Sequence, residues 1–234
     1  MKRKTIIGIL AGISFLLSLP AHAQLQDQRH NFSVGVNGGV NLSSVSFSPA
    51  IKQGKLIGPS FGVTARYISE KYFSMICGIQ AEINYSQRGW KEVYDDESGD
   101  SYQRTMNYVE VPLLAHLAFG KDQGHGARFV LNLGPQVGFL LNESEQKSEG
   151  FDPNNRPTHT NAQYGKMADK KFDYGIVGGF GVEIRTGIGN FIAEGRYYFG
   201  LSDFYNSTKK DDFSRSAHSY LGARITYLFD ITNK

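Results

Sequence analysis

Cysteine is almost absent from this sequence. Cys77 is the single cysteine among 234 residues, so no internal disulfide can stabilise the chain. Its neighbours in a period-two alternation are Met75 and Ile79, which places the thiol on a predicted apolar face. We therefore interpret Cys77 as a small hydrophobic residue rather than as a catalytic nucleophile.

An excess of charge is also absent once the N-terminus is set aside. Lys and Arg number 25 and Asp and Glu number 22, and three of the basic residues are Lys2, Arg3 and Lys4. Removing these three leaves 22 basic residues against 22 acidic ones, which is formally neutral. A nucleic-acid partner would require a basic patch, and this balance gives it no support.

Long apolar runs are confined to the N-terminus as well. Residues 6–19 are apolar, they follow the basic residues, and a small-x-small motif ends at Ala23. The run is short for a membrane-spanning helix, so a signal peptide is favoured over a retained helix. We expect a signal peptide over 1–23, cleaved before Gln24 on export, and a single domain over 24–234.

What the sequence does contain is a repeated alternation of apolar and polar residues. Over 191–201 the odd-numbered residues are mostly apolar, and the even-numbered ones include Glu194 and Arg196. Side chains alternate across a β-strand, so each such segment has one apolar and one polar face. We predict an all-β fold, an eight-stranded antiparallel up-and-down transmembrane β-barrel. The expected strands are 32–42, 58–68, 72–88, 105–119, 128–141, 172–186, 190–204 and 216–230.

The connections between the expected strands alternate in length. The short ones are 69–71, 120–127 and 187–189, and the long ones are 43–57, 89–104, 142–171 and 205–215. Outer-membrane barrels have short periplasmic turns and long extracellular loops. We therefore expect both termini in the periplasm, a mobile polar loop at 142–171, and a hairpin around 89–104 that rises above the membrane.

The polar face of the strands predicts a charged interior. An eight-stranded barrel is just wide enough for side chains to fill it, and buried charges need partners. Four acids and four arginines could therefore form a network that plugs the barrel, which argues against an open pore. The expected inward residues are Arg66, Glu82, Glu110, His116, Glu183, Arg185, Glu194, Arg196 and Arg224.

Catalytic and metal sites are weaker interpretations of the same residues. His116 with Glu110 and Glu82 could form an acid–base cluster, but no nucleophile accompanies them, so a structural network is favoured. His218 and Ser219 are adjacent and would point to opposite faces. The acidic turn 95–100 could hold calcium, although a solvated turn is favoured. We expect no enzyme activity, no cofactor and no metal.

Two short motifs resemble a known family. Tyr108–Leu114 reads YVEVPLL and resembles the YLEIPLL motif of PorT-like outer-membrane β-barrel proteins, and Tyr85–Gly89 reads YSQRG, similar to their YSQKG. The resemblance implies an eight-stranded barrel in the outer membrane of a Gram-negative bacterium, surrounded by outer-membrane lipid.

The resemblance leaves the individual function open. One reading is a structural or binding barrel that acts through its extracellular loops. Another is an accessory subunit with a secretion-system or envelope-assembly protein as partner. A lipid-modifying enzyme is a more remote alternative.

Overall fold

The computed structural model describes residues 27–232 except for 73–74, 95–99, 121–125 and 154–159. The predicted signal peptide 1–23 and its cleavage position at Ala23 and Gln24 therefore lie outside the described residues. Among the described residues, no helix is long and apolar enough to cross a membrane.

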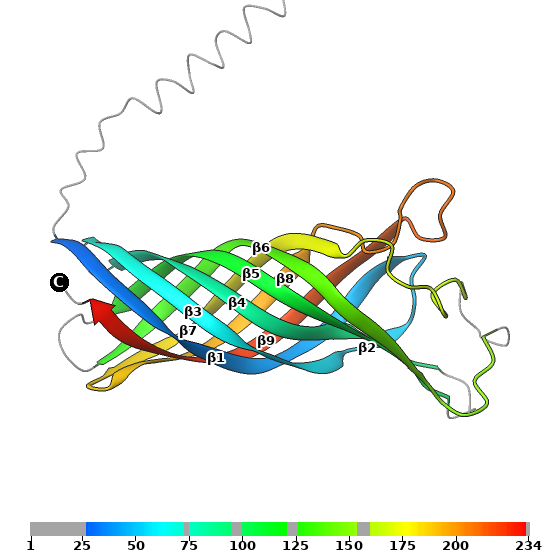
Figure 1. The fold of residues 1–234 in the computed structure, drawn as a ribbon, viewed down its shortest axis with the longest axis horizontal. Coiled ribbons are helices and arrows are strands. Elements are labelled where there is room, and N and C mark those ends of the chain that lie inside the picture. The colour runs from blue at the N-terminus through cyan, green and yellow to red at the C-terminus, as the bar shows by residue number, and fades with distance from the viewer. Residues whose placement is uncertain (1–26, 73–74, 95–99, 121–125, 154–159, 233–234) are drawn as a thin grey trace, which may run out of the picture.

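The described chain forms one antiparallel sheet of nine strands. Its order is β2-β4-β3-β1-β9-β8-β7-β6-β5, and a further pairing of β4 with β5 closes the sheet on itself. Figure 1 shows the strands coiling around a common axis. The strands are β1 (Asp27–Ser48), β2 (Gln53–Gly54), β3 (Leu56–Tyr72), β4 (Met75–Glu92), β5 (Tyr102–Gly120), β6 (Gly126–Lys147), β7 (Phe172–Thr186), β8 (Gly189–Gly200) and β9 (Arg215–Thr232).

Most strands extend beyond their expected bounds; β1, for example, covers Asp27–Ser48 instead of 32–42. Three further differences concern the number of strands and the loops. The additional strand β2 has two residues and pairs with the end of β4, so the count is nine rather than eight. Strand β6 continues to Lys147, inside the expected loop 142–171, because its polar residues pair with the first residues of β5. Strand β8 ends at Gly200 instead of 204, where the chain bends and buries Phe204.

Exposure alternates along the strands with a period of two. Ile225 is 66% exposed, whereas its neighbour Arg224 is 4% exposed. The same contrast holds in β3, where Phe61 and Val63 face outward and Thr64 is buried. The outer surface is therefore apolar and the inner surface polar, which is the reverse of a water-soluble sheet protein.

The two ends of the closed sheet differ. The start of β1 and the end of β9 lie at one end, on the left in Figure 1, and the longer connections extend from the other end. We call these the terminal end and the loop end. At the loop end, buried aromatic side chains form a cluster beneath the connections that follow β1, β4, β6 and β8. This cluster includes Phe47, Trp90, Tyr102, Phe204, Tyr205 and Phe213.

Inward-facing glycines bring the first and last strands together. A Cβ atom on Gly35 or Gly39 of β1 would overlap the carbonyl oxygen of Tyr227 or Ala223 in β9. Glycine permits close backbone approach of this kind. The β1–β9 pairing that joins the two ends of the chain depends on these positions.

Candidate functional site: the charged interior

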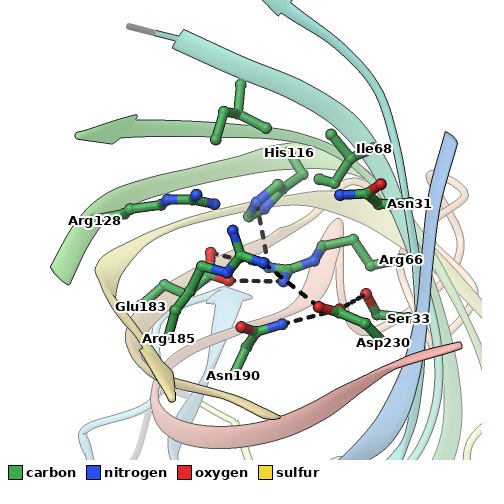
Figure 2. Close-up of a pocket in the computed structure, with 11 residues that line it drawn as sticks. Asn31, Ser33, Arg66, Ile68, His116, Arg128, Glu183, Arg185, Asn190 and Asp230 are labelled. Carbon is green, nitrogen blue, oxygen red and sulfur yellow. Dashed lines mark hydrogen bonds and ion pairs between the residues drawn. The ribbon is translucent and has the colours of Figure 1, made fainter. Parts of the chain in front are cut away.

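A bidentate ion pair lies near the terminal end of the interior (Figure 2). Arg66 of β3 donates to both carboxylate oxygens of Glu183 of β7, at 3.2 and 2.8 Å. The His116 ring lies on the same guanidinium, with 3.4 Å between Nε2 and Nη1, and its Nδ1 is 2.8 Å from Asn132 Oδ1. Arg66, Glu183 and His116 are each at most 3% exposed, so the Arg66 and Glu183 charges are paired with each other away from water.

A second ion pair lies closer to the mouth at this end. Arg185 lies 3.6 Å from Asp230, which also accepts hydrogen bonds from Ser33 and Asn190 at 2.6 and 3.1 Å. The two charged side chains are 19% and 22% exposed. The adjoining cavity has a volume of about 20 Å³. That is room for about one water molecule.

Glu82 is the centre of the next group. Its two oxygens accept hydrogen bonds from Arg196 of β8 at 2.8 and 2.6 Å and from Arg224 of β9 at 2.9 Å. Arg196 also donates to Glu194 at 2.9 Å. Two arginines thus face two glutamates across the interior, a balance that offsets the cost of burying each charge.

Arg88 of β4 holds the third group. It donates to Glu110 at 2.7 Å and to Asp173 at 2.6 Å, and it is fully buried. Its guanidinium carbon lies 4.5 to 5.1 Å from the ring centroids of three tyrosines, which are Tyr108, Tyr198 and Tyr220. Cation–π contacts and ion pairs therefore fix the same side chain from several directions.

Arg104 forms the fourth group, at the loop end. It donates to Glu143 at 2.6 Å and is in contact with Glu145. The outward residues beside it, Asn142 and Ser144, are polar and exposed, so this part of the sheet extends beyond the apolar outer surface.

Hydrogen bonds lower the pKa of the Glu145 carboxyl. Burial alone would raise this pKa, but donation from Tyr102, Lys147 and the amide of Gly165, together with the charge of Arg104, lowers it to about 2. The bond from Gly165 measures 2.7 Å and ties the segment before β7 to β6.

The buried carboxylate of Glu92 also holds the segment before β7 to the β4–β5 hairpin. Glu92 accepts from Tyr94 at 2.9 Å, from Tyr164 at 2.7 Å and from Gln163 at 3.2 Å. Gln163 is fully buried, so the later part of the expected mobile loop 142–171 is packed against the rest of the protein.

The structure brings some of the expected inward residues together and separates others. Arg66 meets Glu183, Arg196 meets Glu82 and Glu194, and Arg224 meets Glu82. The four expected acids and four expected arginines do not pair only with one another. Glu110 is bound by Arg88, and Arg185 is paired with Asp230. Arg88 and Asp230 belong to neither expected set, although each is the last residue of an expected strand and has the parity of its inward residues.

The acid–base cluster, the less favoured interpretation of these residues, does not form. His116 contacts Arg66 and Asn132, whereas Glu82 and Glu110 belong to the two groups described above. His218 is buried between the rings of Tyr108 and Phe204, while the adjacent Ser219 lies on the other face beside Ser44.

Several interior residues escaped the sequence analysis. Arg88, Arg104 and Asp173 have the same parity as the inward residues of their strands, so extending the alternation to the strand ends would have found them. Within the described part of the chain, no group of three or more His, Cys, Asp or Glu side chains could hold a metal ion. Of the acidic turn, residues 95–99 lie outside the described part, and Asp100 accepts a hydrogen bond from Ser148 at 2.6 Å.

Solved structures of bacterial surface proteins resemble this chain at low identity. Neisserial surface protein A is 14% identical, with 85% of this chain and 97% of that chain covered and a TM-score of 0.40. OprG from Pseudomonas aeruginosa is 10% identical, with 86% and 97% covered and a TM-score of 0.47. Ail of Yersinia pestis is 12% identical, with 84% and 98% covered and a TM-score of 0.32.

The family comparison is more informative. No curated protein matches the chain. Residues 22–206, which include most of the strands, match the family described as outer membrane protein beta-barrel domain. With its closed antiparallel sheet, apolar exterior and charged interior, the chain belongs to the outer membrane protein beta-barrel domain family.

Proposed function

We propose that β1 and β3–β9 form an eight-stranded barrel that spans the outer membrane, with the loop end outside the cell and both termini in the periplasm. Outward aromatic residues near both ends support this placement. One girdle contains Phe191 and Tyr227, whose ring centroids are 4.9 Å apart, and the other contains Phe139 and Phe172, 5.1 Å apart. Such girdles mark the two membrane–water interfaces of barrels in this class.

We further propose that the interior is sealed and that the protein does not conduct ions. The observation that carries this proposal is the series of buried ion pairs at successive positions along the axis. Arg66–Glu183, Arg196–Glu82 and Arg88–Asp173 each join strands that are not neighbours in the sheet. Opening a continuous water path would require these pairs to separate, leaving buried charges without partners.

Because a sealed interior offers no path for a solute, we assign the function to the surface formed at the loop end. Arg104 with Glu143 and Glu145, and Glu92 with its tyrosines, fix the loops in a folded surface. We propose a structural or binding role in which this surface contacts an extracellular ligand or another envelope protein, and this role involves no catalytic step. The alternative, a function as accessory subunit of a secretion or envelope-assembly machine, follows if such a partner is found.

Three measurements test the proposal. An epitope inserted after Gly150 is expected to bind antibody on intact cells, and access only after breakage of the outer membrane would reverse the topology. Planar bilayers containing the purified protein are expected to show no stable conductance steps, and reproducible open steps would contradict the sealed interior. Pull-down from native membranes separates the two roles, because a stoichiometric secretion-machine partner would favour the accessory subunit.

A further inference from the structure

Three arginine side chains meet at the small cavity of the terminal end. Arg66 of β3, Arg128 of β6 and Arg185 of β7 all line this cavity. Figure 2 shows their side chains extending into the interior from three different strands. The acidic residues among the lining are Glu183 and Asp230. Three cations therefore face two carboxylates around one confined space.

Two of these cations are diagonal neighbours in the sheet. In the register of β6 and β7, Gly126 pairs with Arg185 and Arg128 pairs with Glu183. Arg128 and Arg185 therefore project from adjacent strands two positions apart, and long side chains can reach one another from such positions. Like charges in this arrangement repel each other, and an anion between them would convert the repulsion into two attractions.

The two carboxylates of the cavity already have partners. Both oxygens of Glu183 accept hydrogen bonds from the Nη atoms of Arg66, at 3.2 and 2.8 Å. Asp230 accepts hydrogen bonds from Ser33 and Asn190. Arg185 lies 3.6 Å from Asp230, which is beyond hydrogen-bonding distance. The donors of Arg185 can therefore bind a further acceptor in the cavity.

Neither the histidine nor the adjacent turn changes the charge balance. The amide of Asn132 donates to Glu194 at 3.0 Å, so its oxygen accepts from Nδ1 of His116. Arg66 can only donate, so Nε2 of His116 accepts and the ring is neutral. The turn 121–125, which lies outside the described residues, contains one Lys and one Asp and is formally neutral. The excess of one positive charge belongs to the cavity as a whole and does not require any arginine to lack a partner.

The size of the cavity selects a small ion. Its volume of about 20 Å³ holds one particle of the size of water, which fits chloride but not a tetrahedral oxyanion such as phosphate. One further donor is available, since Nε of Arg66 is buried and has no hydrogen-bond partner among the described residues. Both Nη atoms of Arg66 face Glu183, so this Nε–H points away from that carboxylate. The Arg185 side chain is 19% exposed, so the cavity can be reached from the terminal end.

We propose that this cavity binds one halide ion, which is chloride in the cell, between Arg128 and Arg185. The ion balances the third guanidinium of the cavity, and charge-assisted hydrogen bonds from the arginines hold it. The barrel would then carry a structural anion at its terminal end. The site depends on neither the proposed membrane orientation nor the role of the loops, and a sealed interior can hold it because no path through the barrel is required.

The test measures urea unfolding of the mature protein in neutral detergent at constant ionic strength. Sodium gluconate, whose anion is too large for the cavity, is exchanged stepwise for sodium chloride or sodium bromide. A ligand that binds the folded state stabilises it in proportion to its occupancy, so the midpoint should rise with either halide and then level off. Crystals grown in bromide should show an anomalous scattering peak inside the cavity.

Two variants of the cavity should change the halide affinity in opposite directions. Arg128→Gln removes the excess charge and should lower the affinity about tenfold, because hydrogen bonds to a charged group are lost. Asp230→Asn increases the excess charge and should raise the affinity, although it removes the partner of Arg185. Opposite signs distinguish an anion site from general damage to the mouth. Arg215→Gln, at an exposed position of the loop end, is the matched control and should leave the halide dependence unchanged.

Equal midpoints in gluconate and chloride, a bromide peak outside the cavity, or the same halide dependence in Arg128→Gln as in the wild type would overturn the proposal. Conductance and epitope access are measured separately, so a failure here is distinguishable from a failure of the proposed topology or of the sealed interior.

Discussion

Glu82 accepts hydrogen bonds from two arginines, Arg196 and Arg224, that belong to neighbouring strands β8 and β9. The three side chains are each at most 4% exposed. One carboxylate therefore holds two cations in place at the centre of the interior, and the stability of the barrel is expected to depend on it strongly.

Replacing that carboxylate is the first prediction. Glu82→Ala leaves Arg196 with Glu194 alone and removes the carboxylate bound by Arg224, and breaking a buried ion pair in this way costs about 3–5 kcal/mol. Urea unfolding in lipid vesicles, followed as loss of the compact band on a gel, should show this decrease. Glu149→Gln, at an exposed position of the loop end, is the control and should change the free energy of unfolding little.

A second prediction compares a buried arginine with a half-buried one. Arg88→Gln removes the cation between Glu110 and Asp173, so it should destabilise by about 3–5 kcal/mol. Arg185→Gln removes a pair whose side chains are 19% and 22% exposed, and water screens such pairs, so its effect should be about 1 kcal/mol or less. Equal midpoints of unfolding for the two variants would show that the interior is hydrated.

Acid should loosen the loop end. The pKa of Glu145 is lowered to about 2 from its usual value near 4.5, so its stabilising effect is complete above pH 4.5 and is lost as the pH falls towards 2. Trp90 is the single tryptophan and lies fully buried in the aromatic cluster, so its fluorescence reports on this region.

The fluorescence of Trp90 should therefore shift to the red between pH 4.5 and 2. Glu145→Gln should show part of this shift already at neutral pH, because Arg104 has lost one of its partners. Emission that stays constant down to pH 2 in the wild type would contradict the role assigned to Glu145.

The outward and inward faces can be distinguished in β9. Ile225→Arg places a charge against hydrocarbon and should cost about 2–4 kcal/mol near the membrane centre. In a Cys77→Ser background, a spin label at 225 should be accessible to oxygen dissolved in the lipid, and a label at 224 should be shielded. The opposite pattern would show that the strand faces are reversed.

The sequence predicts the faces of the strands better than the contacts between them. Period-two alternation alone places Phe61 outward and Arg224 inward, because each position depends only on its own strand. Which acid meets which arginine depends on how the sheet closes. Glu82 and Arg224 are 142 residues apart, and Glu110 meets Arg88 rather than one of the four expected arginines.

The loops were predicted least well, for a related reason. Residues 142–147 have no apolar face to reveal a strand, since their outward side chains face water and their inward ones bind Arg104. The segment around Gln163 is fixed by hydrogen bonds to Glu92, and such bonds leave no periodic pattern in the sequence.

The ion pairs also constrain how the barrel can be assembled. Arg66 and Glu183 are 117 residues apart and come from β3 and β7, so neither is neutralised until most of the chain is present. A sheet inserted strand by strand would expose these charges to hydrocarbon at each intermediate stage. Folding and insertion must therefore be coupled events, with the polar face of the growing sheet kept in contact with water or with assembly machinery until closure sets every charge beside its counterion.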